Sequence, residues 1–415
     1  MDTTQPAAAR SGTSPGEILA LFRDVPDGLT KTDVVQHTGL SRTTVNQRLD
    51  GLLAAGLLVP APRDARTRGR PAGRFVVNRD RGVLLVADLG ATGLRTAVCD
   101  LAGEVRAERE VASDVTDGPE AVLAVVDGLF RELLPETGHV ESDVLGIGIG
   151  VPGPVDFATG RVVSPPIMTG WDRYDIPGHL APRYRCPVLV DKDVNAMAYG
   201  EHRLSYPDVD HLLMVKIGTG VGTGMIAGGR IHRGADGAAG DVGHIQVTVD
   251  DIDEPPVCRC GNTGCVEAYA GGWALVRDLR AAGRDVAGVD DAVRLIRSGD
   301  LTAVRLARRA ARILGVAIAD AVNMFNPRVI VFGGQLAHTE EQLFAGIREV
   351  VYRRSLPLAT RNLQIVRSAL DARAGVMGLS QLLVDGLYAP HRVQELIDGV
   401  PEAHPAPSER TVAAP

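Results

Sequence analysis

Residues 240–267 read GDVGHIQVTVDDIDEPPVCRCGNTGCVE, and this stretch brings one imidazole and three thiols close together in the chain. His244 is followed by Cys258, Cys260 and Cys265, with glycines at positions 261 and 264 between the thiols. Three thiolates and one imidazole suit a closed tetrahedral Zn²⁺ site, which is structural because it leaves no open coordination position. The glycines let the backbone turn tightly enough for all three sulfurs to face one ion.

The same thiols also have a simpler interpretation, because free cysteine is among the most buried residue types. The chain has five cysteines, and three of them fall between positions 258 and 265, which favours a metal. A metal bound by His244 would also hold in place the turn that carries Asp241. Clustered cysteines without a disulfide framework, together with the lack of a signal-peptide pattern at the N-terminus, predict a cytoplasmic protein.

The stretch resembles the signature of the ROK family, named for repressors, open reading frames and sugar kinases. The shared pattern is a Gly-(Glu/Asp)-x-Gly-His turn followed by C-x-C-G-x-x-G-C-x-E. The resemblance implies a two-lobed, actin-like sugar-kinase fold for the larger part of the chain. It also implies a sugar or effector site next to the metal, with contacts at Gly153, Asp193, Asp241, His244 and Glu267. Lys192, which stands where the family usually has an asparagine, is a further candidate for this site.

Charge is divided unevenly along the 415 residues. Residues 1–82 hold 12 Lys and Arg against 8 Asp and Glu, whereas the remainder holds 32 against 43. A basic N-terminal module on an acidic body indicates an anionic partner at that end only. No run of about twenty apolar residues occurs, so no membrane-spanning helix is expected.

The basic module has the pattern of a helix-turn-helix. Ser14, Thr30 and Ser41 each stand where they can cap a helix, and Gly39 separates the second predicted helix from the third. The third helix has an apolar stripe and a polar leading face, which in a recognition helix contacts base edges in the major groove. The candidate DNA-binding residues there are Ser41, Arg42, Thr43, Thr44, Asn46, Gln47 and Arg48.

A basic segment follows this helix and resembles the wing of a winged helix. Residues 63–74 read RDARTRGRPAGR and lead into the strand-like FVVN. Arg68 and Arg70 are expected to enter a minor groove, where the potential of A·T-rich DNA is most negative. Two alternatives stay open: basic loops often contact only phosphate, and a helical protein-interaction module would also have a solvated polar face.

The body alternates strand-like and helical patterns, which predicts an α/β fold. Three buried runs, 83–87, 212–217 and 329–332, each end in a glycine-rich turn of the kind that can cradle phosphate. By resemblance, the first two turns hold the phosphates of ATP and the third lies near adenine. The nucleotide-binding candidates are Asp88, Gly90, Thr92, Gly218, Thr219, Gly220, Gly333 and Gly334.

Asp193 follows another strand-like run and is the candidate catalytic residue. A carboxylate at a strand end can accept the proton of a sugar hydroxyl as general base, and by resemblance Asp193 stands where ROK kinases keep that base. Asp193 could instead cap a helix that begins near Asn195, or do both.

Several positions depart from the family pattern. Lys192 and Pro166 each replace an asparagine, Asp241 replaces a glutamate, and Ala91 replaces the second glycine of the first phosphate turn. Two lost amides and one added cation predict an anionic or phosphorylated sugar as ligand rather than plain glucose. A cleft that binds nothing is the rival interpretation.

We therefore predict an α/β protein with an N-terminal winged helix-turn-helix (14–80) and a two-lobed ROK sugar-kinase-like domain (83–395), flanked by a disordered leader (1–13) and tail (396–415). The expected function is a DNA-binding regulator of carbohydrate genes that acts as a repressor rather than an activator. It is expected to bind an operator as a homodimer or homotetramer and to respond to a sugar or sugar-phosphate effector.

One alternative is an active ATP-dependent sugar kinase that retains a DNA-binding domain, in which ATP and Mg²⁺ would be cofactors. Another is a zinc-stabilised interaction module with no small ligand.

Overall fold

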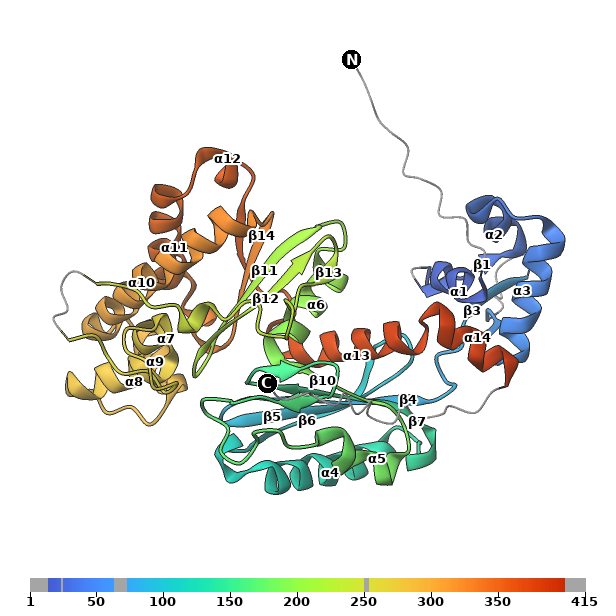
Figure 1. Cartoon of the computed structure of the whole chain (residues 1–415), viewed down its shortest axis with the longest axis horizontal. Coiled ribbons are helices and arrows are strands. Elements are labelled where there is room, and N and C mark those ends of the chain that lie inside the picture. Colours follow the sequence, from blue (N-terminus) through green and yellow to red (C-terminus); the bar gives the residue numbers. More distant parts are fainter. Residues whose placement is uncertain (1–13, 24, 63–72, 250–253, 400–415) are drawn as a thin grey trace, which may run out of the picture.

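The computed structural model describes residues 14–23, 25–62, 73–249 and 254–399. A small helical module at the N-terminus stands beside a two-lobed α/β body (Figure 1). The predicted architecture, a winged helix-turn-helix followed by two lobes built on sheets, is confirmed.

The N-terminal module contains α1 (Pro15–Arg23), β1 (Leu29–Thr30), α2 (Lys31–Thr38), α3 (Arg42–Ala54), β2 (Leu58–Pro60) and β3 (Arg74–Val77). The three strands form an antiparallel sheet in the order β1-β3-β2. All three predicted caps are present: Ser14 exchanges hydrogen bonds with Glu17, Thr30 with Asp33, and Ser41 accepts one from the backbone of Thr44. Each cap satisfies backbone N–H groups that a helix end leaves without a partner.

The first lobe is a five-stranded sheet in the order β10-β7-β4-β5-β6. Its strands are β4 (Val83–Leu89), β5 (Gly93–Cys99), β6 (Val105–Ala112), β7 (Val144–Val151) and β10 (Val188–Lys192), and a small hairpin of β8 (Val155–Asp156) and β9 (Arg161–Val162) extends from it. Helices α4 (Pro119–Glu136) and α5 (Ile176–Tyr184) cover one face, and α13 (Ala374–Leu387) covers the other (Figure 1).

The second lobe repeats this plan with a sheet in the order β13-β12-β11-β14-β15. Its strands are β11 (His211–Ile217), β12 (Val221–Ala227), β13 (Arg230–Ile231), β14 (Val329–Gly333) and β15 (Gln364–Arg367). Helices α7 (Val266–Ala270), α8 (Gly272–Ala281), α9 (Val289–Arg297), α10 (Leu301–Phe325), α11 (Glu340–Arg354) and α12 (Pro357–Thr360) complete this lobe. Helix α6 (Asp193–Ser205) packs on the opposite side of the sheet, against β11 and β12.

The two lobes meet where α6 crosses α13. A Cβ on Gly378 of α13 would lie 1.7 Å from the carbonyl oxygen of Ala196, and one on Gly200 would lie 2.6 Å from that of Ala374. The helices can approach so closely only because both positions are glycine. Any movement of one lobe therefore acts on α6 and α13 together.

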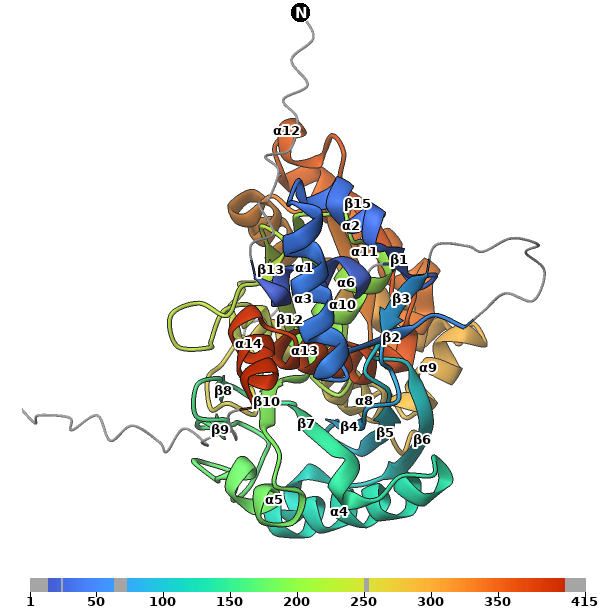
Figure 2. The ribbon, with the colours of Figure 1, turned by 90° about the vertical axis from the view of Figure 1, so that its right-hand side faces the viewer.

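The C-terminal helix α14 spans Pro390–Asp398. The prediction that a disordered tail begins at residue 396 is therefore wrong for residues 396–398. Leu396 and Ile397 lie in its last turn and pack against a hydrophobic cluster that joins the N-terminal module to the first lobe. Figure 2 shows α14 beside α1 and α3. The sequence pattern of this helix is short and polar, so its burial could not be recognised without its partner helices. Within the described residues, no helix has the length and apolar character needed to cross a membrane.

Candidate functional site

A cleft of about 530 Å³ lies between the lobes, and it collects residues that are far apart in the sequence. Every predicted sugar or effector residue lines it: Gly153, Lys192, Asp193, Asp241, His244 and Glu267. The predicted nucleotide residues Asp88, Gly90, Thr92, Gly218, Thr219, Gly220 and Gly334 line it as well. Gly333 does not, because it is the buried last residue of β14, with methyl groups of Met197 and Met214 against its backbone.

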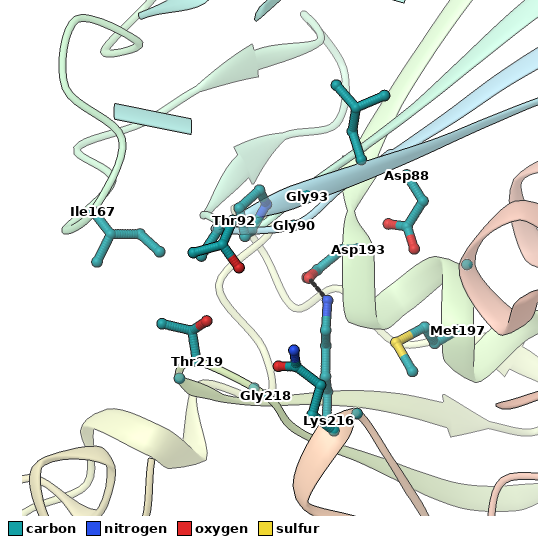
Figure 3. A pocket seen from close by; sticks show the side chains of 18 of the residues that line it. Asp88, Gly90, Thr92, Gly93, Ile167, Asp193, Met197, Lys216, Gly218 and Thr219 are labelled. Atoms are coloured by element: carbon teal, nitrogen blue, oxygen red, sulfur yellow. Dashed lines mark hydrogen bonds and ion pairs between the residues drawn. The ribbon is translucent and has the colours of Figure 1, made fainter. Parts of the chain in front are cut away.

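Asp193 lies at the floor of this cleft and is held by a lysine that our sequence analysis missed. Lys216 on β11 donates from Nζ to Asp193 Oδ2 at 2.5 Å (Figure 3). The other carboxylate oxygen accepts a hydrogen bond from the backbone N–H of Val194 at 2.7 Å. Helix α6 starts at Asp193 itself rather than near Asn195, so this carboxylate occupies the first helical position and not the cap. A single lysine inside the apolar run LLMVKI was the available signal.

Asp88 is the second carboxylate of this group, at the end of β4. Its Oδ1 is buried and has no hydrogen-bond partner among the described residues. Burial raises the pKa of Asp88 to about 7; Lys216 opposes this rise and Asp193 adds to it. Burial by itself lowers the pKa of Lys216. The carboxylates of Asp193 and Asp88 outweigh this effect and raise the pKa of Lys216 above its ordinary value.

The second cleft lysine, Lys192, is also neutralised within the protein. Its Nζ donates to Asp241 Oδ1 at 2.9 Å, and Lys192 is buried. The hypothesis that Lys192 favours an anionic or phosphorylated sugar stays a prediction, and in the structure the charge of this lysine is already paired with a carboxylate. Its charge pairs with the shortened acidic side chain of Asp241, which is another of the departures from the family pattern.

Glu267 is anchored at one end of the cleft by two donors. The backbone N–H of Val221 donates to Oε2 at 3.0 Å, and the indole Nε1 of Trp273 donates to Oε1 at 3.2 Å. The carboxylate lies directly against Gly220, where a Cβ would come within 2.4 Å of Oε2. Buried charge held by fixed donors is preorganised to accept hydrogen bonds from a ligand.

The predicted metal ligands converge beside this end of the cleft. One ligand atom from each of His244, Cys258, Cys260 and Cys265 lies within 4.8 Å of the others. His244 Nδ1 is 3.7 Å from the sulfur of Cys258. The soft donor set and its compact arrangement fit a tetrahedral metal.

Backbone geometry supports this cluster. Gly261 and Gly264 have φ values of +92° and +74°, in the left-handed region that favours glycine. His244 both belongs to the cluster and lines the cleft. Cys265 directly precedes α7, which carries Glu267.

The candidate DNA-binding residues lie together on α3 and at its N-terminus. Arg42, Thr43, Asn46 and Gln47 are exposed, and Thr44 and Arg48 are half-buried. Ser41 uses its hydroxyl to cap the helix through the Thr44 N–H at 3.2 Å. The Nε of Arg48 is buried without a described partner. Arg68 and Arg70 lie outside the described residues.

Comparisons with known proteins cover both parts of the chain. A model of the ROK family matches residues 85–385, and a model of the MarR family matches residues 16–67. A protein named "Putative xylose repressor" from Caldicellulosiruptor sp. (strain Rt8B.4) is 30% identical over 376 residues, which are 87% of this chain and 93% of that relative.

Two solved structures are similar to the protein, and they cover different shares of its chain. A ROK family transcriptional regulator, described as a homologue of the E. coli MLC protein, is 26% identical with a TM-score of 0.77, over 93% of this chain and 98% of its own. A ROK family glucokinase from Streptomyces griseus, in complex with glucose and AMPPNP, is 29% identical with a TM-score of 0.63. The glucokinase match covers 99% of that chain but 72% of this one.

Proposed function

The chain belongs to the ROK family and is a transcriptional regulator of that family, and from this premise we propose how its parts divide the work. Residues 14–80 bind operator DNA, and the lobes from residue 83 onward bind a sugar that changes the affinity for DNA. The observation that carries the proposal is the combination of an exposed, donor-rich recognition helix with a sugar-kinase-like cleft in one chain. Repression of carbohydrate genes is the expected outcome, as the name of the xylose repressor relative suggests.

The recognition helix supports DNA binding through donors that are left exposed. Arg42, Asn46 and Gln47 lie on one face of α3, and none of their side chains has an ion pair or hydrogen bond to another described residue. Arginine suits bidentate contact with guanine, and asparagine and glutamine suit adenine. We further propose a homodimer or homotetramer, whose paired modules would contact half-sites about one helical turn apart.

A line of contacts connects the cleft to the DNA-binding module. Asp193 begins α6 in the cleft, and Tyr199, further along α6, donates from its hydroxyl to Asp385 of α13. The guanidinium of Arg23 in α1 forms an ion pair with the same carboxylate. Ligand binding that shifts α6 against α13 would act directly on the contact that orients α1. Such coupling requires the ligand to bind one arrangement better than the other.

The charges of the cleft favour an uncharged sugar as effector. The lining residues include the carboxylates of Asp88, Glu110, Asp193, Asp241, Glu267, Asp290 and Asp371, against the cations of Arg95, Lys192 and Lys216. Each of these three cations has a carboxylate partner. A phosphoryl group would therefore meet a predominantly acidic surface, whereas sugar hydroxyls can donate to the carboxylates.

We also propose that the His244 and cysteine cluster binds Zn²⁺ and has a structural role. It would fix His244 and, through the start of α7, Glu267 at the sugar end of the cleft. Because four protein ligands would fill the tetrahedral site, the metal would position Glu267 without having an open coordination position of its own.

The experiment is selection of duplexes from a random library with the purified full-length chain, followed by titration of the selected duplex at about 150 mM salt. We expect an affinity at least about 10³-fold above that for random duplex. Xylose or glucose should change operator affinity about 5-fold to 150-fold, and the corresponding sugar phosphates should change it less. If the chain prefers no duplex over random duplex, the proposal that it binds operator DNA is rejected. A stronger response to the sugar phosphates would reject the proposal of an uncharged effector and leave the DNA-binding proposal in place.

A further inference from the structure

Lysine is rare in this protein, and its positions are not random. Of the 44 basic residues in the chain, three are lysines: Lys31, Lys192 and Lys216. Lys31 lies in the N-terminal module, and both lysines of the body line the cleft. Each of those two pairs with a cleft carboxylate. Apart from Lys31, the compact, point-like ammonium groups of the lysines are both at this one site, and the other basic residues are arginines.

Lys216 has the more unusual surroundings of the two. It projects from β11 of the second lobe toward the end of β4 in the first lobe (Figure 3). Asp193 accepts its hydrogen bond at 2.5 Å, and Asp88 lies beside them with Oδ1 buried and without a described partner. Backbone encloses Asp88 closely, since a Cβ on Gly375 would lie 2.1 Å from Oδ2 and one on Gly150 3.1 Å from Oδ1. Lys216 thus pairs directly with Asp193 at the floor of the cleft, and its charge acts on Asp88 without a direct contact.

A kinase of this fold would need Mg²⁺ and ATP phosphates at these glycine-rich turns. Mg²⁺ prefers carboxylate oxygens and keeps several waters in a strict octahedron. Here an ammonium group already neutralises Asp193 and influences Asp88, and a divalent ion beside it would be repelled. Ala91 adds a methyl group to the first phosphate turn. The residues present therefore do not fit a bound Mg–ATP.

We infer that Lys216 is the resident cation of the cleft, which neutralises Asp193 beside Asp88 and makes this a sugar-binding site that excludes Mg–ATP. The ammonium also ties β11 of the second lobe to Asp193, which directly follows β10 of the first lobe. Asp193 remains as a hydrogen-bond acceptor for the sugar. The inference concerns the metal preference of the cleft and stands independently of the DNA-binding proposal.

The test measures Mn²⁺, a spectroscopic substitute for Mg²⁺, on the full-length protein with its metal cluster loaded with zinc. Free Mn²⁺ is quantified by electron paramagnetic resonance during titration of wild type, Lys216→Met, Lys192→Met and the double variant Lys216→Met/Asp193→Asn. Methionine matches the lysine side chain as far as its Cε and lacks the charged amino group. Thermal unfolding of each variant reports whether it is folded.

Wild type should show no saturable Mn²⁺ binding, and Lys216→Met should bind Mn²⁺ at least about 100-fold more tightly, because a repulsive unit charge within a few ångströms has been removed. The double variant should lose most of that gain. Lys192→Met is the matched control, since it removes the other cleft lysine and leaves Asp88, Asp193 and Lys216 in place, and it should gain none.

Three results would overturn the inference: saturable Mn²⁺ binding by wild type, the absence of a gain in folded Lys216→Met, or an equal gain in Lys192→Met. If Lys216→Met does not fold, the inference is tested on the wild-type protein alone, by a second measurement. Release of ADP from Mg–ATP in the presence of xylose or glucose, above the level of an Asp193→Asn variant, would contradict the exclusion of nucleotide, and its absence together with absent Mn²⁺ binding would support it.

Discussion

The recognition helix and the cleft differ in whether their polar side chains have partners within the protein. On α3, Arg42, Asn46 and Gln47 are exposed and have no hydrogen-bond or ion-pair partner among the described residues. In the cleft, Lys192 and Lys216 each form an ion pair with an aspartate on the same surface. Both regions are rich in polar groups, and they differ in whether those groups are already satisfied.

This difference indicates what each surface receives. A polyanion such as DNA provides the acceptors that exposed donors need, and binding to it is strengthened by unpaired positive charge. A small uncharged ligand gives no such compensation, so charges near it must be balanced by the protein itself. Under the proposed function, the internal pairing of the cleft lysines would favour an uncharged ligand.

The metal cluster beside the cleft offers the largest test of the comparison, because all four of its side chains are predicted to bind one ion. Cys260→Ser should abolish stoichiometric zinc and lower the free energy of unfolding of the body by about 4 kcal/mol, the linkage expected for a ligand present at a thousand times its Kd. Metal analysis and urea unfolding measure the two effects. Cys186→Ser, a buried thiol outside the cluster, should retain the zinc. A stable, metal-free Cys260→Ser protein would refute the structural metal.

Removing one partner of a cleft ion pair should cost somewhat less. Asp193→Ala leaves the Lys216 ammonium partly buried without its main partner, and such a loss costs about 3 kcal/mol of unfolding free energy. Urea denaturation at neutral pH checks this expectation. The control is Glu136→Ala, which breaks the exposed pair with Arg109 and should cost less than about 1 kcal/mol. Equal costs would show that the cleft pair is no more structural than a surface pair.

The smallest expected effect falls on the recognition helix, and on binding rather than on stability. Arg42→Ala should weaken binding to the selected operator by about 2 kcal/mol if a bidentate base contact is lost, with unfolding unchanged because the side chain is exposed. Fluorescence anisotropy with operator and scrambled duplexes separates the terms, and Arg109→Ala is the surface control. Equal weakening on both duplexes would assign Arg42 to phosphate contact only.

Much of the local structure could be predicted because its causes are local. The caps at Ser14, Thr30 and Ser41 depend on a side chain and a backbone group three residues apart. The cluster of three cysteines lies within one short loop, and its glycines are needed for backbone turns inside that loop. Helix starts, strand runs and the soft-ligand motif can therefore be recognised in the sequence, and the winged helix follows from them. The two-lobed body was expected from the resemblance to the ROK family.

The ion pairs of the cleft depended on the tertiary structure. Lys216 reaches Asp193 only because β11 of one lobe faces the first turn of α6 across the floor of the cleft, and no local pattern specifies that approach. The same reason explains the unexpected α14, whose apolar residues acquire meaning only against α1 and α3. Sequence alone determined which elements form and which chemical groups they carry. The folded chain decided which charges meet, because ion pairs between distant segments depend on how whole elements pack.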